Sequence, residues 1–418
     1  AEDMEQFMHK SRILGLGEVM DANSVINCSQ EMLDKLRLFD KRPIDGHAPM
    51  LEGMGLNAYR VAGAFSDHEC STYEEVKQKL ATGMNILLRI GSAANNMDGV
   101  LRRIAKEKLP TRNMMFCTDD KHIEDIRREG HINANARMAV AAGIDPIDAI
   151  KMASYNAARA YGIRGVGAIA PGYKADMVLL EDLKDFKVKQ VISRFGRPYT
   201  GEEQIPSPIL PTQVFNSVRL PEISKYDLAL RCHVSAPVIK MIPHQLVTEL
   251  VYRDVERDEN GCFIPSEGMV KLAVIERHHA TGSMAVGILE GLGIKHGAVA
   301  STVAHDSHNL VVAGDNDEDM LMAIESLRDC GGGYSVVSRG VVLARLPLPI
   351  AGLMTAAPVN DVLEIQQALL DALYSLGARR DSDPLIALSF MALPVIPAVK
   401  LTDEGLFDAV NFKFIKYN

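Results

Sequence analysis

The sequence predicts an α/β protein in three parts: a parallel sheet covered by helices, a small β unit, and an α+β domain. Up to about residue 140, apolar strands alternate with helical segments roughly every 25–35 residues, which is the rhythm of repeated βαβ units. Short strands with Gly and Pro turns follow, and Pro206, Pro208 and Pro211 mark a linker. A chain of 418 residues suits two or three domains, which we place at residues 1–163, 164–205 and 206–418.

Five strands are expected in the first part, and each delivers a polar residue at or near its carboxyl end. In chain order they are RILGLGEVM with Glu18, PIDGHAP with His47, AFSDHE with His68, NILLRIGS with Ser92, and RNMMFCTDD with Asp119. A parallel α/β fold gathers the carboxyl ends of its strands on one face, where its functional sites are built. We therefore expect Glu18, His47, His68 and Asp119 to lie close together.

Several helices can be located from their capping residues and their pattern. The segment CSQEMLDKLRLFDK predicts a helix between the first two strands. Ser71, three residues before Glu74, has the spacing of a capping box. Asp145 suits an N-cap and Pro146 the first helical position of the segment that follows. In the last part, DEDMLMAIESLRDC predicts a helix among apolar strands.

Composition excludes some classes of partner. The net charge of −9 and the pI near 5.8 argue against a nucleic-acid-binding protein, which usually needs a basic face. No apolar run reaches the roughly 20 residues of a membrane span, so no membrane partner is expected. The six cysteines lack CxxC pairs and indicate neither a disulfide framework nor a zinc ribbon. A reducing, cytoplasmic setting is the expectation.

The residues at the strand ends have the chemistry of a metal site. Imidazole and carboxylate groups are ligands for zinc, manganese or iron. A single histidine at a strand end is more often a hydrogen-bonded loop residue than a ligand. Four such residues on four different strands are less easily explained as ordinary loop residues. Together, Glu18, His47, His68 and Asp119 therefore predict a metal site.

The adjacent aspartates after the fifth strand are expected to have different roles. Asp119, at the tip of the strand, would ligate the metal and take a proton from water. Asp120 would point the other way, because side chains alternate along a strand, and would bind a nitrogen of the substrate. The alternative is that Asp120 is the N-cap of the following helix.

Two histidine-containing segments of the last part also attract attention. The sequence AHDSHN carries His305, Asp306 and His308 within four positions. One reading is a loop that contacts the substrate, and the other is a polar turn packed on a neighbouring domain. His278 and His279 follow an apolar strand and are expected in a solvated turn.

Two residues near the aspartates have less specific signals. His131, in EGHINANARM, is expected on the helix after the fifth strand, where it either supports a ligand or is a polar group on the helix face. Cys117 sits just before the aspartates. A nucleophilic role is not expected for Cys117, because no His–Cys pairing can be read from the sequence.

The motifs together resemble those of a known family. GEVMD, DGHAP, SDHE, GSAANN, CTDD, EGHIN and GAIAPGYKADMVLL resemble landmarks of the amidohydrolase superfamily, in its adenine deaminase branch. The segments VAHDSHNLVVAG, LPLPIAGLM and LPVIPAVKLTDEGLFD resemble the extra C-terminal domain of adenine deaminases. The resemblance covers nearly the whole chain. It implies strands four to eight of a metal-dependent hydrolase (β/α)8 barrel, a segment of the small β domain, and the C-terminal α+β domain.

The resemblance assigns roles to individual residues. Glu18 resembles the strand-four bridging ligand, His47 the strand-five ligand and His68 the strand-six ligand. Asp119 resembles the strand-eight aspartate, which is both ligand and general base, and His68 is the second candidate catalytic residue. The residues assigned to substrate binding are Asp120, Ser92, His305, Asp306 and His308.

The implied reaction is hydrolysis of adenine to hypoxanthine and ammonia, a step of purine salvage. The implied cofactor is one or two divalent ions, Mn²⁺ or Fe²⁺, with Zn²⁺ as the alternative. A homo-oligomer is expected, with adenine as the small-molecule partner.

The sequence departs from the family pattern in two places. It contains no His-x-His pair, the family's strand-one signature, and Ile90 stands where an acidic residue is expected. A whole barrel needs about 250 residues, more than precede the β unit here. We therefore expect the C-terminal part of an adenine deaminase, with an incomplete metal site. The alternatives are another amidohydrolase acting on a cyclic amide or amino-purine, and a non-catalytic fragment.

Overall fold

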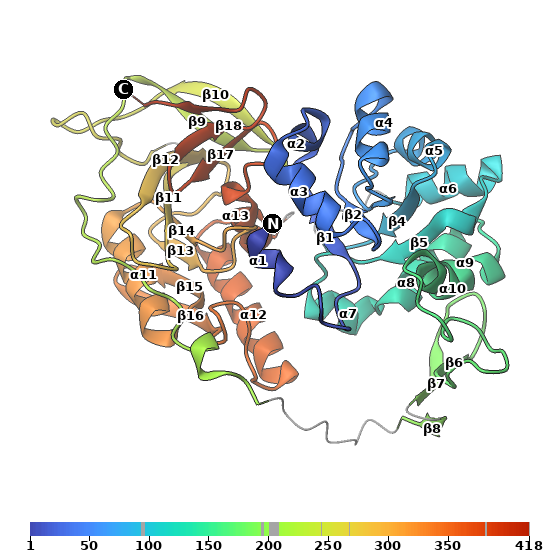
Figure 1. The fold of residues 1–418 in the computed structure, drawn as a ribbon. Helices are drawn as coiled ribbons and strands as arrows, with labels where there is room; N and C mark the ends of the chain where they lie inside the picture. The colour runs from blue at the N-terminus through green and yellow to red at the C-terminus, as the bar shows by residue number, and fades with distance from the viewer. Residues whose placement is uncertain are drawn as a thin grey trace. The chain divides into compact units, whose positions relative to one another are not determined.

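The chain forms two compact units, Ala1–Pro206 (unit 1) and Ser207–Asn418 (unit 2), and each is described by itself (Figure 1). The structure, a computed structural model, describes residues 1–92, 97–193, 196–199, 209–243, 245–266, 268–380 and 383–417. Most of the expected linker, with Pro206 and Pro208, and the last four residues of the motif GSAANN lie outside the described residues.

Unit 1 contains five short parallel strands separated by helices, as the sequence predicts (Figure 1). The strands are β1 (Leu16–Val19), β2 (Ile44–Gly46), β3 (Ser66–Asp67), β4 (Asn85–Arg89) and β5 (Met114–Cys117). The helices are α1 (Glu2–Glu5), α2 (Ala22–Ile26), α3 (Gln30–Leu38), α4 (Gly53–Val61), α5 (Tyr73–Ala81), α6 (Met97–Glu107), α7 (Ile123–Glu129), α8 (Ile132–Ala141), α9 (Pro146–Ala153) and α10 (Tyr155–Ala160).

The five strands lie side by side in chain order. β1 pairs with β2, and β3, β4 and β5 form a second parallel ladder. Just before β3, the N–H of Phe65 donates to the carbonyl of Ile44 in β2 at 3.0 Å, which links the two ladders. Ile86 and Leu88 alternate with half-buried residues along β4 and are fully buried in the core of unit 1. All the carboxyl ends therefore lie on one edge, whereas closure into a barrel stays a prediction.

The caps of two helices test the sequence analysis. Asp145 accepts hydrogen bonds from the first turn of α9 and Pro146 is its first residue, which confirms that prediction. The capping box of α5 is displaced by one residue from the predicted pair: Thr72 is the N-cap and Glu75 completes the box. The register is set by burial, because Tyr73 and Val76 must face the core while Glu75 remains free to bend back to the cap.

A small antiparallel sheet follows the parallel strands. Its order is β6 (Met177–Leu180), β7 (Val188–Ser193) and β8 (Arg197–Pro198), which confirms the predicted change of rhythm. The turn between β6 and β7 buries Phe186 in the same core as the parallel strands. The division of the chain accordingly groups this sheet with unit 1.

Unit 2 is an α+β domain, as predicted, and the structure shows that it is built around an eight-stranded sheet. The strand order is β10-β9-β12-β11-β14-β13-β15-β16, antiparallel except where β12 meets β9. The strands are β9 (Ser235–Met241), β10 (Thr248–Asp254), β11 (Met269–Ile275), β12 (Met284–Glu290), β13 (Ala298–Ser301), β14 (Leu310–Gly314), β15 (Gly333–Ser338) and β16 (Val341–Pro347). A smaller sheet contains β17 (Val399–Thr402), β18 (Gly405–Asp408) and β19 (Lys413–Ile415).

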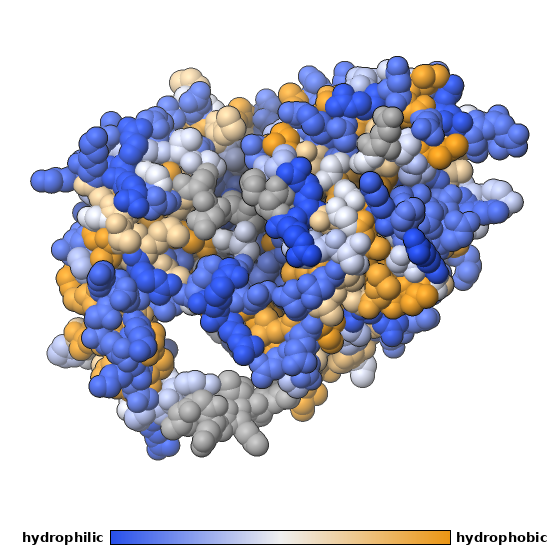
Figure 2. All heavy atoms as spheres, turned by 180° about the vertical axis from the view of Figure 1, so that it is seen from behind, coloured by the Kyte–Doolittle hydropathy of each residue, from blue (hydrophilic) through white to orange (hydrophobic). Residues whose placement is uncertain are grey.

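The described part of unit 2 contains the α-helices α11 (Asp317–Cys330), α12 (Val359–Ser375) and α13 (Pro384–Ser389). The predicted helix DEDMLMAIESLRDC is α11, with Asn316 as its N-cap and Gly331 in the left-handed conformation after its end. The face seen in Figure 2 is mainly hydrophilic with interspersed apolar side chains, as is usual for a folded protein. Among the described residues, no helix combines the length and the hydropathy that crossing a membrane requires.

Lys400 in β17 is a buried lysine with little compensation. Its side chain is fully buried, and its Nζ donates to the carbonyl of Leu246 at 2.8 Å. No acidic side chain of the described residues forms an ion pair with it. Burial lowers the pKa of this amine from 10.5 to about 7.

We predict that Lys400→Met stabilises unit 2 at pH 7, by about 1–3 kcal/mol, because it removes the cost of burying an amine. The folded pKa lies below the unfolded one, so the cost of Lys400 grows as pH falls from about 10.5 to about 7 and is constant below that. The increase in the free energy of unfolding that Lys400→Met causes should therefore be smaller at pH 10 than at pH 7. Urea unfolding of the variant and the wild type at both pH values measures this difference.

The matched control is Lys271→Met, because Lys271 is also buried but is paired with Asp317 at 2.7 Å. That variant should destabilise the protein, since it leaves a partly buried carboxylate without its cation. A Lys400→Met variant no more stable than the wild type at pH 7 would contradict the prediction.

Candidate metal centre

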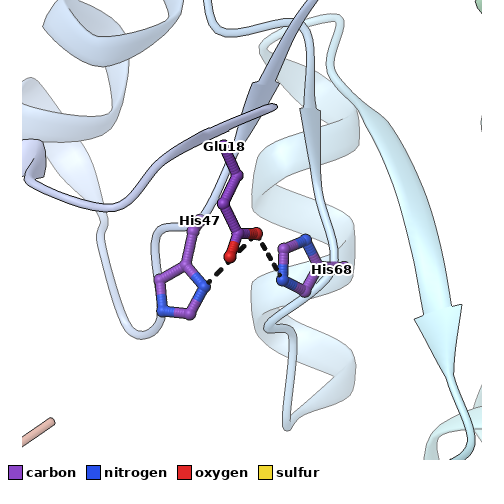
Figure 3. A group of neighbouring side chains, drawn as sticks. All are labelled: Glu18, His47 and His68. Carbon is purple, nitrogen blue, oxygen red and sulfur yellow. Dashed lines mark ion pairs between the residues drawn. The ribbon is translucent and has the colours of Figure 1, made fainter. Parts of the chain in front are cut away.

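Three side chains from the ends of β1, β2 and β3 converge in unit 1 (Figure 3). Glu18 lies in β1, His47 directly follows β2, and His68 directly follows β3. The Nε2 atom of His68 lies 2.9 Å from Oε2 of Glu18, and Nδ1 of His47 lies 3.7 Å from the same oxygen. His47 is buried and His68 is half-buried, so the group opens to solvent mainly at Glu18.

A second group overlaps the first at His68. One donor atom each from His68, Glu69 and Asp119 lie within 4.8 Å of one another. Oε1 of Glu69 is 3.6 Å from His68 Nε2 and 4.0 Å from His47 Nδ1. The structure therefore brings the four predicted residues to one edge of the sheet, in two groups that share His68. Their function as ligands stays a prediction.

Arg89, the last residue of β4, lies between two carboxylates of the site. Its Nη1 atom is 2.5 Å from Oε1 of Glu69 and 2.6 Å from Oδ2 of Asp119. The guanidinium is largely buried with a side-chain exposure of 16%, so the two ion pairs are poorly screened by water. Arg89 thus compensates the negative charge that the strand ends gather.

The backbone around the two aspartates has an unusual conformation and a close contact with the end of β4. Asp119 has a φ of +52°, a left-handed conformation that Asp tolerates better than most residues. The end of β4 passes very close to this turn: a Cβ on Gly91 would lie 2.6 Å from the carbonyl oxygen of Thr118. Glycine at position 91 lets the two strand ends meet there. The aspartate side chain is thereby turned toward Arg89 and His68.

The electrostatics of the first group follow from the close His–Glu contact. Burial alone would raise the pKa of Glu18, but the imidazoles of His47, 3.7 Å away, and of His68, 2.9 Å away, hold it well below its usual range. Burial alone would lower the pKa of His68, but its hydrogen bond to Glu18 and the charges of Glu18, Glu69 and Asp119 raise it to about 9. Without a metal, a protonated His68 therefore balances the carboxylates.

The donor atoms fit a divalent ion. Nδ1 of His47 is buried and has no hydrogen-bond partner, although buried polar atoms are normally satisfied. Donors bound to one ion at about 2.1 Å lie roughly 3–3.5 Å apart, close to the 2.9–3.7 Å between Glu18 and the two histidines. Two imidazoles and carboxylate oxygens are also the donor set of zinc, iron and manganese.

The other predicted residues near the aspartates have mixed outcomes. Asp120 is not the N-cap of the next helix, because α7 begins at Ile123 after His122, so that alternative is wrong. Its half-buried side chain is consistent with the substrate-binding prediction, which stays untested. The hydroxyl of Ser92 accepts from the N–H of His122 at 2.9 Å and donates to Asp125, so Ser92 ties down the start of α7.

His131 and Cys117 flank the site without entering it. His131 is the N-cap residue of α8, and its Nε2 lies 3.2 Å from Oγ1 of Thr118, the residue before Asp119. That contact supports the interpretation in which His131 stabilises the turn that carries Asp119, a predicted metal ligand. Burial raises the pKa of the Cys117 thiol to about 12, so it is not ionised near neutral pH.

The histidines of the C-terminal segments lie in unit 2. His278 and His279 are exposed in a turn, as predicted, and Glu276 accepts from both of their N–H groups. His305 stacks on Phe390 with a ring separation of 4.2 Å, and Asp306 is exposed. The backbone carbonyl of His308 accepts from the buried guanidinium of Arg277. A substrate contact by His305, Asp306 or His308 stays a prediction.

Sequence reasoning missed two residues of the site, Glu69 and Arg89. Glu69 directly follows His68 in the motif SDHE, so a second carboxylate beside the predicted ligand was a visible signal. Arg89 directly precedes Ile90, the buried residue at which an acidic group was expected. Strand alternation places a residue facing opposite to Ile90 at position 89, and this is the polar residue that β4 delivers to the site.

Comparison with known proteins identifies the family. Residues 2–197 match the amidohydrolase family, and residues 245–413 match the adenine deaminase C-terminal domain. The chain is 44% identical over 418 residues to an adenine deaminase of Desulfitobacterium hafniense (strain Y51), covering 100% of this chain and 73% of that protein. It is 45% identical over 425 residues to an adenine deaminase of Nitratidesulfovibrio vulgaris (strain DP4), and the match covers 99% of this chain and 73% of that protein.

Solved structures are more distant. An enamidase described as a member of the amidohydrolase superfamily aligns over 47% of this chain and 58% of its own, with a TM-score of 0.36 and 18% identity. Class membership therefore rests on the family matches and the relatives rather than on this superposition.

The parallel strand ends with their histidine and carboxylate cluster, together with the family match, define a hydrolase of the amidohydrolase superfamily, a class that uses divalent metal. The identity along the whole length of the chain is more specific. The chain belongs to the adenine deaminase family.

We predict that His47→Gln and His68→Gln each lower the affinity for Mn²⁺ at least about tenfold in the full-length gene product, because each removes an imidazole donor from the centre. Metal content after dialysis against limiting Mn²⁺ measures the loss. His278→Gln is the matched control, since this histidine is exposed in a turn of unit 2. Undiminished metal content in both site variants would exclude these histidines as ligands.

Proposed function

We propose that the protein hydrolyses adenine to hypoxanthine and ammonia. The observation that carries this proposal is the 44–45% identity to adenine deaminases along the whole chain, with the histidine and carboxylate cluster at the strand ends of the amidohydrolase part. Adenine is accordingly the proposed substrate. The free cysteines fit a reducing cytoplasmic setting, in which the reaction would serve purine salvage and the enzyme would act as a homo-oligomer.

Glu18, His47 and His68 would hold a divalent ion, and Asp119 would complete its surroundings. We propose Mn²⁺ or Fe²⁺, one or two ions, with Zn²⁺ as the alternative, because mixed imidazole and carboxylate donors suit all three. When bound, the ion lowers the pKa of water so that hydroxide is available near neutral pH. Glu69, which faces both histidines, is a further candidate donor.

Asp119 is the proposed general base. Arg89 binds its Oδ2 atom at 2.6 Å and fixes the direction of the carboxylate. The side chain is one-third exposed, so it can reach both water and a bound substrate. We assign to Asp119 the uptake of the proton from the attacking water and its delivery to the amine that leaves C6 of the purine. A carboxylate held by an arginine can carry out both transfers without moving far.

His68 is the second proposed catalytic residue. Its Nε2 atom lies 2.9 Å from a carboxylate oxygen of Glu18 and 3.6 Å from one of Glu69, and a ring nitrogen of His68 lies within 4.8 Å of a carboxylate oxygen of Asp119. These contacts support the proposal that His68 binds the ion and orients the proton acceptor. Asp120 is the proposed ligand of a purine nitrogen. Ser92 would act by fixing the turn between Asp120 and α7, since its N–H donates to the Asp120 carbonyl at 2.8 Å.

A second candidate function is a non-catalytic member of the family. Another amidohydrolase activity, on a cyclic amide or a different amino-purine, is less favoured because the adenine deaminase C-terminal domain matches residues 245–413. An assay of ammonia release separates these possibilities.

We predict that Asp119→Asn lowers kcat for ammonia release from adenine about 10²–10⁴-fold in the Mn²⁺-loaded full-length gene product. Asn keeps an oxygen near the ion but cannot accept the proton of water. A coupled ammonia assay measures the rate. Asp98→Asn, an exposed aspartate of α6 paired with Arg102, is the control and should leave the rate unchanged. Full activity in Asp119→Asn would place the general base elsewhere, and an inactive wild type would favour the non-catalytic reading.

Asp120→Asn should behave differently. Asp120 is not in either of the two groups of side chains that could hold a metal ion, so we predict that this variant retains its metal content. We predict that its KM for adenine rises about tenfold or more, because one charged hydrogen bond to the substrate is lost. Steady-state kinetics and metal analysis on the same preparation test this. Loss of metal together with activity would instead make Asp120 part of the centre.

A further inference from the structure

A buried ion pair lies directly behind the candidate metal centre. Lys79 of α5 and Asp67 of β3 have fully buried side chains, and Nζ of Lys79 is 3.0 Å from Oδ2 of Asp67. The same Nζ donates to the carbonyl of Ala48 at 2.7 Å. Glu75, one turn earlier on α5, adds a third charge 3.6 Å from Nζ. The ammonium group is therefore fully engaged by one helix, one strand end and one loop.

The Asp67 carboxylate binds the backbone beside both histidines. Its Oδ1 atom accepts from the N–H of Ala48, the residue after His47, at 2.8 Å. Its Oδ2 atom accepts from the N–H of Glu69, the residue after His68, at 3.1 Å, and from the Cys70 thiol. One carboxylate thus spans the two loops that carry His47, His68 and Glu69.

Lys79 also binds the loop that carries His47. Ala48 is held twice, by its N–H to Asp67 and by its carbonyl to Lys79, so the peptide units after His47 cannot shift without breaking a buried bond. Glu75 extends the same hold, because its Oε1 atom accepts from the N–H of Met50 at 2.7 Å. The loop after β2 is therefore fixed against α5 over three residues.

We propose that Asp67 and Lys79 are positioning residues, which set the separation between the imidazoles of His47 and His68 that the metal centre requires. The ring centroids are 5.3 Å apart, and Nδ1 of His47 has no hydrogen-bond partner among the described residues that would orient this ring independently. This inference rests on the proposed metal-dependent function. It assigns neither residue a contact with metal or substrate.

Stability alone is a poor explanation for the pair. Desolvation offsets most of the attraction in a buried ion pair, and well-packed apolar side chains are often as stable. An apolar pair, however, could not bind two N–H groups and a carbonyl on separate loops. The charged pair supplies three directed hydrogen bonds, two to Ala48 and one to Glu69, and all three end at a residue next to a predicted metal ligand.

The test uses the double variant Asp67→Asn/Lys79→Met in the full-length gene product. Lys79→Met leaves the buried Asp67 carboxylate without its cation, and Asp67→Asn leaves Lys79 with only the more distant Glu75, so each single variant should lower the melting temperature. The double variant removes both buried charges and should recover most of that loss. A merely structural role would recover metal binding along with stability. We expect instead that the double variant binds Mn²⁺ about 10–100-fold more weakly than the wild type, with a parallel fall in kcat for adenine.

Lys271→Met, which breaks the buried pair with Asp317 in unit 2, is the matched control. It should lower stability and leave Mn²⁺ affinity unchanged. Wild-type Mn²⁺ affinity in the double variant would overturn the inference. If the wild type itself binds no Mn²⁺, the metal assignment fails separately. A crystal structure of the double variant then decides: a changed His47–His68 separation supports the positioning role, and an unchanged one overturns it.

Discussion

The organisation of unit 1 depends on one electrostatic constraint: parallel strands gather several carboxylates at one edge, and each needs a compensating charge or donor. Glu18, Glu69 and Asp119 meet there, and Arg89 binds the last two while His68 binds the first. A bound cation would add to the same balance. Placing the negative charge of Asp119 at the end of a buried strand costs free energy, and Arg89 from the neighbouring strand offsets this cost by pairing with the carboxylate.

The sequence predicted the strand ends well for a physical reason. A short apolar run that ends in a polar residue has few alternatives to a buried strand, and the strands of successive βαβ units are parallel, so their carboxyl ends lie on one edge. Glu18, His47, His68 and Asp119 followed from that rule. Arg89 did not, because the target of a long flexible side chain depends on the neighbouring strand. The cap of α5 shifted by one residue because burial of Tyr73 outweighed the equally good spacing of Ser71.

Unit 2 shows where the sequence was less informative. The position of its helix α11 was predicted residue for residue. The order of eight strands, with β12 parallel to β9, depends on long-range pairing that local patterns do not encode. His305 and His308 illustrate the difference: a dense polar motif in the sequence became a loop whose contacts, such as the ring of Phe390, come from distant residues.

The site and its support differ in how completely their polar atoms are paired. Behind the site, Asp67 and Lys79 use their atoms on backbone partners, and the Tyr59 hydroxyl bridges the N–H of His47 and the carbonyl of Val19 at 3.0 and 2.5 Å. At the site, Nδ1 of His47 is buried and unpaired. Leaving a buried donor or acceptor unpaired costs free energy. The proposed metal ion would give the His47 nitrogen a partner, beside residues whose own polar atoms are already paired with the backbone.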